Sequence, residues 1–159
     1  MTHPRTHKSK QMTYRKATQK DLASVFPIFN DYRVWYEKET DLTGAEKFIS
    51  ERLQNNDSEI FIAENSDQQI LGFVQLYPLF SSTRMKRLWL LNDLFVAKDH
   101  RGKGISIGLI DKAKELAKAT NACALMLETD KSNFIGNKLY PRTGFKMNEI
   151  SNYYEWANQ

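Results

Sequence analysis

Apolar residues recur at helical spacing in four stretches of the chain. The first stretch begins at Thr18, where an acid three residues later completes a typical helix start, and its apolar face continues to near Tyr36. A second helix is expected to open at Thr43. A third runs from Ile105, after two glycines, to about residue 120, and a short fourth occupies residues 133–144.

Runs rich in β-branched and aromatic residues lie between these helices, as strands require. They are expected at residues 12–18, 59–64, 69–79, 87–97 and 123–129, followed by a final pair within 145–156. The run at 87–97 is almost wholly apolar, which is typical of a strand that is covered on both faces. The order β-α-α-β-β-β-α-β-α-β-β predicts an α/β fold in a single domain, with a mixed central sheet flanked by helices.

The net charge and the cysteine content narrow the class of protein. The formal charge is +4, but three basic residues lie before Thr13, so the remainder is almost neutral. We interpret residues 1–11 as a flexible basic N-terminal leader, with a nucleic-acid arm as the alternative, and residues 12–159 as the folded domain. The absence of a signal peptide and of a long apolar run favours a cytoplasmic protein. The lone Cys123 excludes an internal disulfide, and the three histidines lack metal-ligand spacing, so no metal is expected.

Two of the seven glycines stand one residue apart in the stretch LNDLFVAKDHRGKGIS, residues 91–106. They lie between an apolar run and a helix, where backbone N–H groups and the positive end of a helix dipole are suited to bind one anion. A nucleoside-triphosphate loop is excluded because no G-x-x-x-x-G-K-[ST] string occurs. A dinucleotide turn fits poorly because the next glycine, Gly108, comes one residue late. A pyrophosphate bound without magnesium and a turn without any ligand both stay open at this point.

The same stretch resembles the acyl-CoA-binding motif of the GNAT superfamily of N-acetyltransferases, [RQ]-x-x-G-x-[GA]. Arg101, Gly104 and Ser106 take its marked positions, with serine in place of the usual glycine or alanine. A second signature, N-x-x-[AG]-x-x-[LF]-Y-x-[KR]-x-G-F, matches residues 133–145 at every marked position. The resemblance implies a GNAT fold over residues 12–156 and acetyl-CoA as the co-substrate. The chain is also similar to the spermidine/spermine and thialysine acetyltransferase branch of the superfamily.

The resemblance also implies which residues hold acetyl-CoA. The backbone of a strand that separates from its neighbour pairs with the pantetheine arm, and the glycine loop binds the pyrophosphate. An asparagine that caps the second-signature helix, with a lysine and a tyrosine inside that helix, completes the contacts. The implied cofactor-binding residues are Leu94, Phe95, Val96, Arg101, Gly102, Lys103, Gly104, Ile105, Ser106, Asn133, Lys138 and Tyr140.

Three residues are candidates for the chemistry. Tyr140 falls at the position of the family's general acid, whose phenol protonates the leaving thiolate; a core aromatic is the alternative. Asp93 lies among apolar neighbours, where a carboxylate without a task is costly. Polyamine-type relatives carry a Glu-Asp pair here, whereas Asn92 replaces the glutamate in this chain. We therefore expect Asp93 to act through a water or to hold the substrate ammonium, with a structural hydrogen-bonding role as the alternative.

The acceptor is expected to meet the loop after the first helix and the strands beside it. Trp35 and Tyr36 offer an aromatic wall, and Glu37 a negative charge that attracts a cationic amine. Tyr77 and Asp93 complete the predicted substrate-binding set.

The leading hypothesis is acetyl-CoA-dependent N-acetyl transfer to a primary amine of a small molecule, by direct attack in a ternary complex. A protein lysine or N-terminal acetyltransferase is one alternative, and a non-catalytic acyl-CoA-binding module is another. The resemblance further implies a homodimer, for which the aromatic segment NYYEW is suited. No nucleic-acid or membrane partner is expected.

Overall fold

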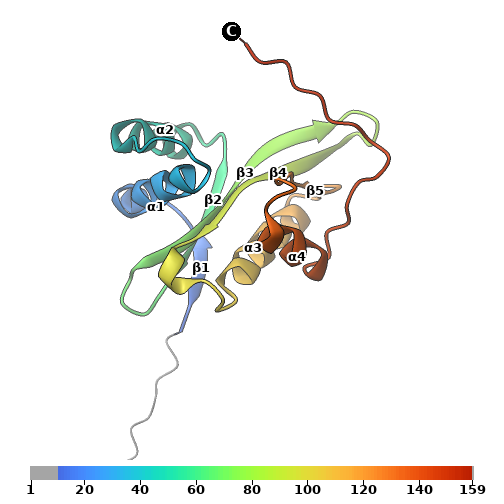
Figure 1. Ribbon diagram of the computed structural model, residues 1–159. Helices are drawn as coiled ribbons and strands as arrows, with labels where there is room; N and C mark the ends of the chain where they lie inside the picture. The colour runs from blue at the N-terminus through green and yellow to red at the C-terminus, as the bar shows by residue number, and fades with distance from the viewer. Residues whose placement is uncertain (1–10, 159) are drawn as a thin grey trace, which may run out of the picture. The chain divides into compact units, whose positions relative to one another are not determined.

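The protein is described by a computed structural model that covers residues 11–158, and these residues form two compact units (Figure 1). The first unit ends at Leu127, and the second begins at Glu128. The predicted basic leader lies outside the described residues, apart from Gln11, which has no regular structure.

The first unit holds a five-stranded sheet and three α-helices. Its strand order is β1-β2-β3-β4-β5, antiparallel throughout except for the parallel pair of β4 and β5. The predicted mixed α/β class is therefore confirmed. In chain order the elements are β1 (Thr13–Lys16), the short 3-10 turn η1 (Gln19–Asp21), α1 (Leu22–Trp35), α2 (Leu42–Asn55), β2 (Glu59–Glu64), β3 (Ile70–Ser81), β4 (Lys86–Val96), a second 3-10 turn η2 (Lys98–His100), α3 (Ile105–Ala119) and β5 (Leu125–Met126).

Helices cover both faces of this sheet, with α1 and α2 on one face and α3 on the other (Figure 1). Successive residues of β3, Phe73 and Val74, are both fully buried, as a doubly covered strand requires. Phe29 of α1 packs edge-on against Phe73, with 6.2 Å between the ring centroids. On the opposite face α3 buries Leu109 and Ile110. The apolar residues at helical spacing are thus the ones that contact the sheet.

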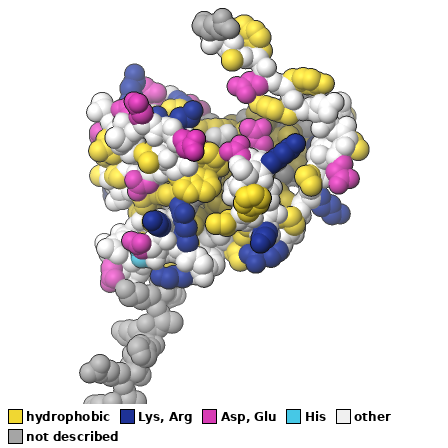
Figure 2. All heavy atoms as spheres, viewed as in Figure 1, with side chains coloured by type: hydrophobic (Ala, Val, Ile, Leu, Met, Phe, Trp, Pro, Cys, Tyr) yellow, Lys and Arg dark blue, Asp and Glu magenta, His cyan; other side chains and the backbone are white. Residues whose placement is uncertain are grey.

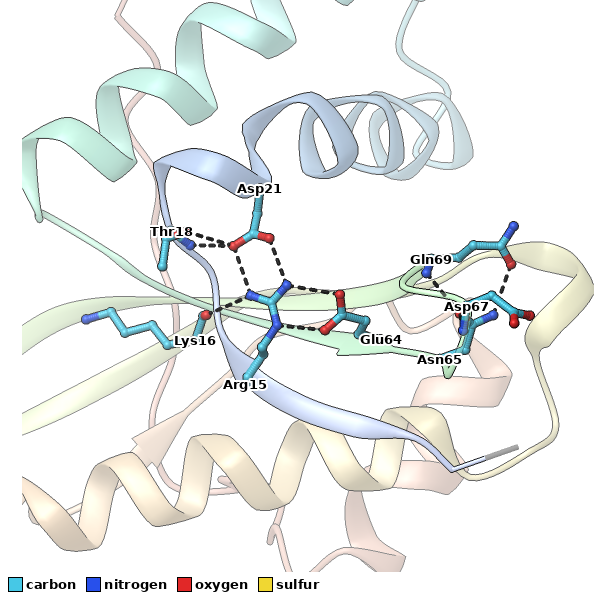
Figure 3. Close-up of polar contacts among 8 residues, drawn as sticks. All are labelled: Arg15, Lys16, Thr18, Asp21, Glu64, Asn65, Asp67 and Gln69. Atoms are coloured by element: carbon cyan, nitrogen blue, oxygen red, sulfur yellow. Dashed lines mark hydrogen bonds and ion pairs between the residues drawn. The ribbon is translucent and has the colours of Figure 1, made fainter. Parts of the chain in front are cut away.

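One guanidinium joins three elements at the β1 edge of the sheet (Figure 3). The Nε atom of Arg15 donates to Oε2 of Glu64 at 2.7 Å, and its Nη2 atom donates to Oδ1 of Asp21 at 2.8 Å. These charge-assisted hydrogen bonds lower the pKa of both carboxyls, because they favour the ionised form. The other carboxylate oxygen of Asp21 accepts the backbone N–H of Thr18 at 2.7 Å, which confirms the predicted helix start.

The turn from β2 to β3 is closed by the side chain of Asn65 (Figure 3). Its Oδ1 atom accepts the backbone N–H groups of Asp67 and Gln69 at 3.0 and 2.9 Å. A side chain that captures the backbone in this way fixes a tight turn, so the two strands pair as a hairpin.

Charge is spread rather than concentrated on the face in view. Figure 2 shows acidic and basic side chains interspersed over α1 and α2, which agrees with the near-neutral charge expected for the body of the chain. Among the described residues, no helix has both the length and the apolar character needed to cross a membrane.

The second unit contains α4 (Phe134–Arg142) and no strand among its described residues, 128–158. The predicted final pair of strands within 145–156 is therefore wrong. Tyr153 and Trp156 are 74% and 83% exposed, and charged or amide side chains interrupt the apolar residues of this segment. A strand needs a paired edge and one sustained apolar face, and this segment lacks the alternation that would supply the face.

The fifth strand is also shorter than predicted. A buried strand was expected at residues 123–129, but β5 contains only Leu125 and Met126, and Met126 is 48% exposed. Its described pairing is with Trp89 and Leu90 of β4 alone. A strand that is paired along one side only is less buried than its apolar sequence suggests.

Candidate active site

The glycine turn leads from β4 through η2 into α3. Gly102 and Gly104 have φ angles of 74° and 78°, in the left-handed region that favours glycine. A Cβ atom built at either position has no neighbour within 4 Å, so the backbone path and not crowding requires glycine. Gly104 is the N-cap of α3, whose first N–H groups have no acceptor inside the helix. Backbone donors at a helix N-terminus, together with the helix dipole, are suited to bind an anion.

The side chain of Arg101 braces this turn against two other elements. Its Nε atom donates to the carbonyl oxygen of Val96 at 2.9 Å, and its guanidinium lies over the ring of Phe95 at 5.1 Å from the centroid. The same guanidinium lies 5.8 Å from the ring centroid of Trp35, at the end of α1. A predicted cofactor-binding residue and a predicted substrate-binding residue are thus in contact.

β4 carries a bulge beside Asp93. Gln75 of β3 pairs with Asp93, and the next residue, Leu76, pairs with Leu91, so Asn92 is the extra residue. Bulges redirect side chains and often occur next to active sites. Asn92 is exposed, whereas Asp93 is only 3% exposed. The two predicted polar residues of β4 therefore lie in different surroundings.

One backbone edge of β4 is free after the bulge. Residues 94–96 pair with β3 on one side. On the other side, the described partner strand β5 reaches only Trp89 and Leu90, so no described strand pairs with this edge of residues 94–96. A strand edge without a partner strand can bind an extended chain that carries amides. The Val96 carbonyl oxygen, however, already accepts the Nε atom of Arg101. The predicted role of Leu94, Phe95 and Val96 is compatible with this edge.

Asp93 is held by neutral donors alone. Gln75 Nε2 donates to its Oδ2 atom at 2.7 Å, and Asn92 Nδ2 donates to its Oδ1 atom at 3.0 Å. The hydroxyl of Tyr32 is a third donor to the carboxyl. Burial raises the pKa of Asp93 because it penalises the charged form, and the three hydrogen bonds offset this only in part.

Tyr32 and Gln75 are site residues that sequence reasoning missed. The Tyr32 hydroxyl also lies 3.5 Å from the carbonyl oxygen of Asn92, and its ring packs edge-on against Phe95. Its helical spacing identifies it only as a core residue. For Gln75 a signal was present, because a single amide inside an apolar strand requires a polar partner.

The predicted acceptor residues differ in their surroundings: three are aromatic residues close to the Asp93 cluster, and the fourth is an exposed acid. Trp35 and Tyr36 stack edge-on with 4.9 Å between ring centroids, and Tyr36 packs on Tyr32 at 5.1 Å, so the aromatic wall adjoins the Asp93 cluster. Burial, and then the nearby Asp93, raise the pKa of Tyr77. Glu37 is different, since it is exposed and its backbone turns with a φ of 59° after α1.

Three predicted site residues, Asn133, Lys138 and Tyr140, belong to the second unit. The Oδ1 atom of Asn133 accepts the N–H of Gly136 at 3.0 Å, which caps α4, and its Nδ2 atom donates to Thr129 at 2.8 Å. Tyr140 is partly exposed and packs edge-on against Phe145, with 5.8 Å between ring centroids. Lys138 is exposed on the same helix. The predicted capping role of Asn133 is confirmed.

A hollow of about 300 Å³ is lined by residues that include Asp57, Arg87 and Trp89, at the opposite end of β4 from the glycine turn. It contains none of the predicted site residues. Among residues 11–158, no group of three or more histidine, cysteine, aspartate or glutamate side chains is arranged to hold a metal ion.

Comparisons with known proteins agree with the motifs. The sequence profile of the acetyltransferase (GNAT) family matches residues 22–145. The uncharacterized N-acetyltransferase YhfO of Bacillus subtilis (strain 168) is 43% identical over 135 residues, which cover 85% of this chain and 90% of that protein. The crystal structure of a probable acetyltransferase has a TM-score of 0.88 at 32% identity, covering 92% of this chain and 98% of the other. The crystal structure of a predicted acetyltransferase with acetyl-CoA from Clostridium acetobutylicum has a TM-score of 0.74 at 22% identity, covering 91% and 96%.

The fold and the turn define a mixed α/β protein with a left-handed glycine turn at a helix N-terminus. The family match is more specific: the chain belongs to the acetyltransferase (GNAT) family, and it is an acetyltransferase. The predicted superfamily and enzyme class are confirmed, which sets aside the non-catalytic binding module. Similarity to the spermidine/spermine branch stays a prediction.

Proposed function

We propose that the protein transfers the acetyl group of acetyl-CoA to a primary amine of a small molecule, by direct attack within a ternary complex. One observation carries the proposal. Along the path from β4 to α3, a buried carboxyl at a bulge is followed by a free strand edge and then by a left-handed glycine turn. These are a proton acceptor, a binding edge for an amide-bearing arm and an anion site, in the order that a CoA thioester requires.

The residues present fit acetyl-CoA. The backbone from Arg101 to Ser106 would hold the pyrophosphate, because the left-handed path at its two glycines leads into the N-terminus of α3. The free edge of residues 94–96 would pair with the pantetheine arm. From the second signature, Asn133 and Lys138 are proposed as further contacts. When bound there, acetyl-CoA supplies a thioester carbonyl as the acyl donor.

Asp93 is proposed to take the proton of the attacking amine, directly or through a water beside Asn92. An amine like that of lysine, with a pKa of about 10.4, is protonated at neutral pH and must lose a proton before attack. Burial raises the pKa of Asp93, which makes this carboxyl a better proton acceptor than an exposed aspartate. Trp35, Tyr36 and Tyr77 would flank the amine, and Glu37 would attract its charge from solvent.

Tyr140 is proposed to donate a proton to the sulfur. A nitrogen–carbon bond forms and the carbon–sulfur bond breaks. Asp93 accepts the first proton of the ammonium before attack, Tyr140 gives its proton to the thiolate, and the second proton of the nitrogen then restores the Tyr140 hydroxyl. Support for this role comes from the second signature, in which Tyr140 takes the marked tyrosine position.

A screen of acceptor amines tests the proposal. The protein is mixed with acetyl-CoA and, separately, with polyamines, amino acids, aminoglycosides and a lysine-containing peptide, and the release of free thiol is followed. Thiol release with at least one small amine is the expected result. Release with the peptide alone would transfer the assignment to a protein acceptor, and release with none of them would contradict the proposal.

The variant Tyr140→Phe tests the proton donor. Loss of general acid catalysis is expected to lower kcat by about 10²-fold. The Kd for CoA, measured by calorimetry, should stay nearly unchanged. Tyr153→Phe, an equal change at a 74% exposed tyrosine of the same unit, is the matched control and should retain full activity. An unchanged kcat in Tyr140→Phe would remove this residue from the mechanism.

A further inference from the structure

Gln75 is a fully buried amide in the middle of β3, and both ends of its side chain are bound. The hydroxyl of Ser58 donates to its Oε1 atom at 3.0 Å. Its Nε2 atom donates to Oδ2 of Asp93 at 2.7 Å. Ser58 is itself buried, with 7% exposure. A continuous chain of hydrogen bonds therefore runs from the start of β2, through β3, to the bulge of β4.

The direction of the Gln75 amide decides which of its atoms, Nε2 or Oε1, faces the Asp93 carboxyl. In the observed direction a donor faces the carboxylate, whereas a flipped amide would turn Oε1 toward it, and two acceptors would then face each other. The Asp93 carboxylate, which only accepts, requires the observed direction. In that direction the Ser58 hydroxyl satisfies the buried Oε1 atom at the other end of the amide, without touching Asp93.

Among the described residues, no cation forms an ion pair with the buried carboxyl of Asp93. The titratable groups that face Asp93 are Tyr32 from α1 and Tyr77 from β3, and beyond Tyr77 lie Arg52 of α2 and Asp57. None of the described ion pairs includes Asp93. The ionised form of this carboxyl therefore depends on the number of neutral donors that reach it.

We propose that Gln75, whose buried Oε1 atom is satisfied by Ser58, is a positioning residue that keeps Asp93 ionisable and directed toward the bulge at Asn92. The inference rests on the proposed function, in which Asp93 accepts the proton of the amine. Removing the Gln75 donor leaves two donors on the carboxyl and shifts its ionisation to higher pH. A larger fraction of the proton acceptor would then be protonated at a given pH, although the residues proposed to hold acetyl-CoA are unchanged.

The test is a titration of the Asp93 carboxyl carbon by ¹³C NMR in the free protein, with the signal assigned by its loss in Asp93→Asn. Gln75→Leu is expected to raise the titration midpoint by about one pH unit, since a hydrogen bond to a charged group is being removed. Ser58→Ala should raise it by less. The double variant Gln75→Leu, Ser58→Ala leaves no unpaired hydroxyl and serves if the single variant does not fold. Gln54→Leu is the matched control, because Gln54 is an exposed glutamine whose amide donates to Ser50 on α2.

Rate measurements on the same variants complete the test. The acid limb of kcat/KM for the acceptor should move upward with the midpoint in Gln75→Leu, while the KM for acetyl-CoA stays unchanged. An unmoved midpoint would overturn the inference whatever the activity. A midpoint that moves while the rate profile does not would overturn the role of Gln75 in the reaction, and with it the role proposed for Asp93. In that case acetyl transfer itself would still stand on the thiol-release screen.

Discussion

Two polar clusters lie along the sheet, and they differ in the charge of the side chains that bind their carboxyl groups. At the β1 edge, Arg15 donates to Asp21 and Glu64, and this lowers the pKa of both carboxyls (Figure 3). At the β4 bulge, Asp93 receives hydrogen bonds from uncharged side chains only, and burial raises its pKa.

The difference separates a structural cluster from the one to which we assign a catalytic role. A carboxylate that is paired with a guanidinium stays ionised and fixes one geometry. A buried carboxyl without a cation costs stability in its charged form, and burial shifts its ionisation to higher pH. Such a group is poorly suited to holding a fold together and well suited to exchanging a proton, so Asp93 is the one we connect with catalysis.

Asp93→Asn should give the largest effect. Loss of the proposed proton acceptor is expected to lower kcat/KM for the acceptor by about 10²-fold or more. Binding of CoA, followed by calorimetry, should be retained because the glycine turn is untouched. Glu64→Gln is the matched control, since it makes the same chemical change in the other cluster, and it should alter stability and not turnover. Equal activity losses in the two variants would erase the distinction between the clusters.

Arg15→Met should give a moderate loss of stability and no loss of turnover. The Arg15 side chain is 35% exposed, so solvent screening limits the expected loss of unfolding free energy to about 1 kcal/mol. Urea unfolding measures it, and Lys47→Met, which removes an exposed helix pair, should cost less.

The pH dependence of that loss has a definite sign. The folded pKa of Asp21 and of Glu64 is lowered, so the cluster stabilises the fold above the unfolded values of about 4, and this contribution is lost as pH falls through the folded pKa values. The difference in unfolding free energy between wild type and Arg15→Met should therefore shrink on acidification. A difference that grows in acid would contradict the assignment.

Salt should have the smallest effect and should again separate the clusters. Partly exposed ion pairs weaken as ionic strength rises, so the difference between wild type and Arg15→Met should shrink by a few tenths of a kcal/mol in high salt. The titration midpoint of Asp93 should change less, because its partners are uncharged. A strong salt dependence of that midpoint would point to a charged neighbour that this account lacks.

Local signals were sufficient for much of the fold. Thr18 with Asp21 predicted the start of the first helix, and the capping contact is present. The spacing of apolar residues after Gly104 predicted α3, and the two glycines predicted an unusual backbone, which their positive φ angles confirm. These features depend on residues that are close in sequence.

The errors and omissions arise where pairing partners are distant in sequence. The segment at 145–156 contains aromatic residues, but strand formation depends on an edge to pair with, and composition does not supply one. Likewise, Gln75 and Tyr32 join the site only because β3 pairs with β4 and α1 lies on that face. A single sequence indicated that Asp93 was unusual, but it did not indicate which groups hold it.

The most direct test of the account compares two pH dependences in the wild-type protein. The pH profile of kcat/KM for the acceptor reports the ionisation of the free enzyme, and ¹³C NMR reports the titration of Asp93 in the same state. The acid limb is expected to have the same midpoint as the Asp93 titration, above the ordinary range of an aspartate. It should disappear in Asp93→Asn. An acid limb at another pH, or one that persists in Asp93→Asn, would contradict the claim that this buried carboxyl accepts the proton.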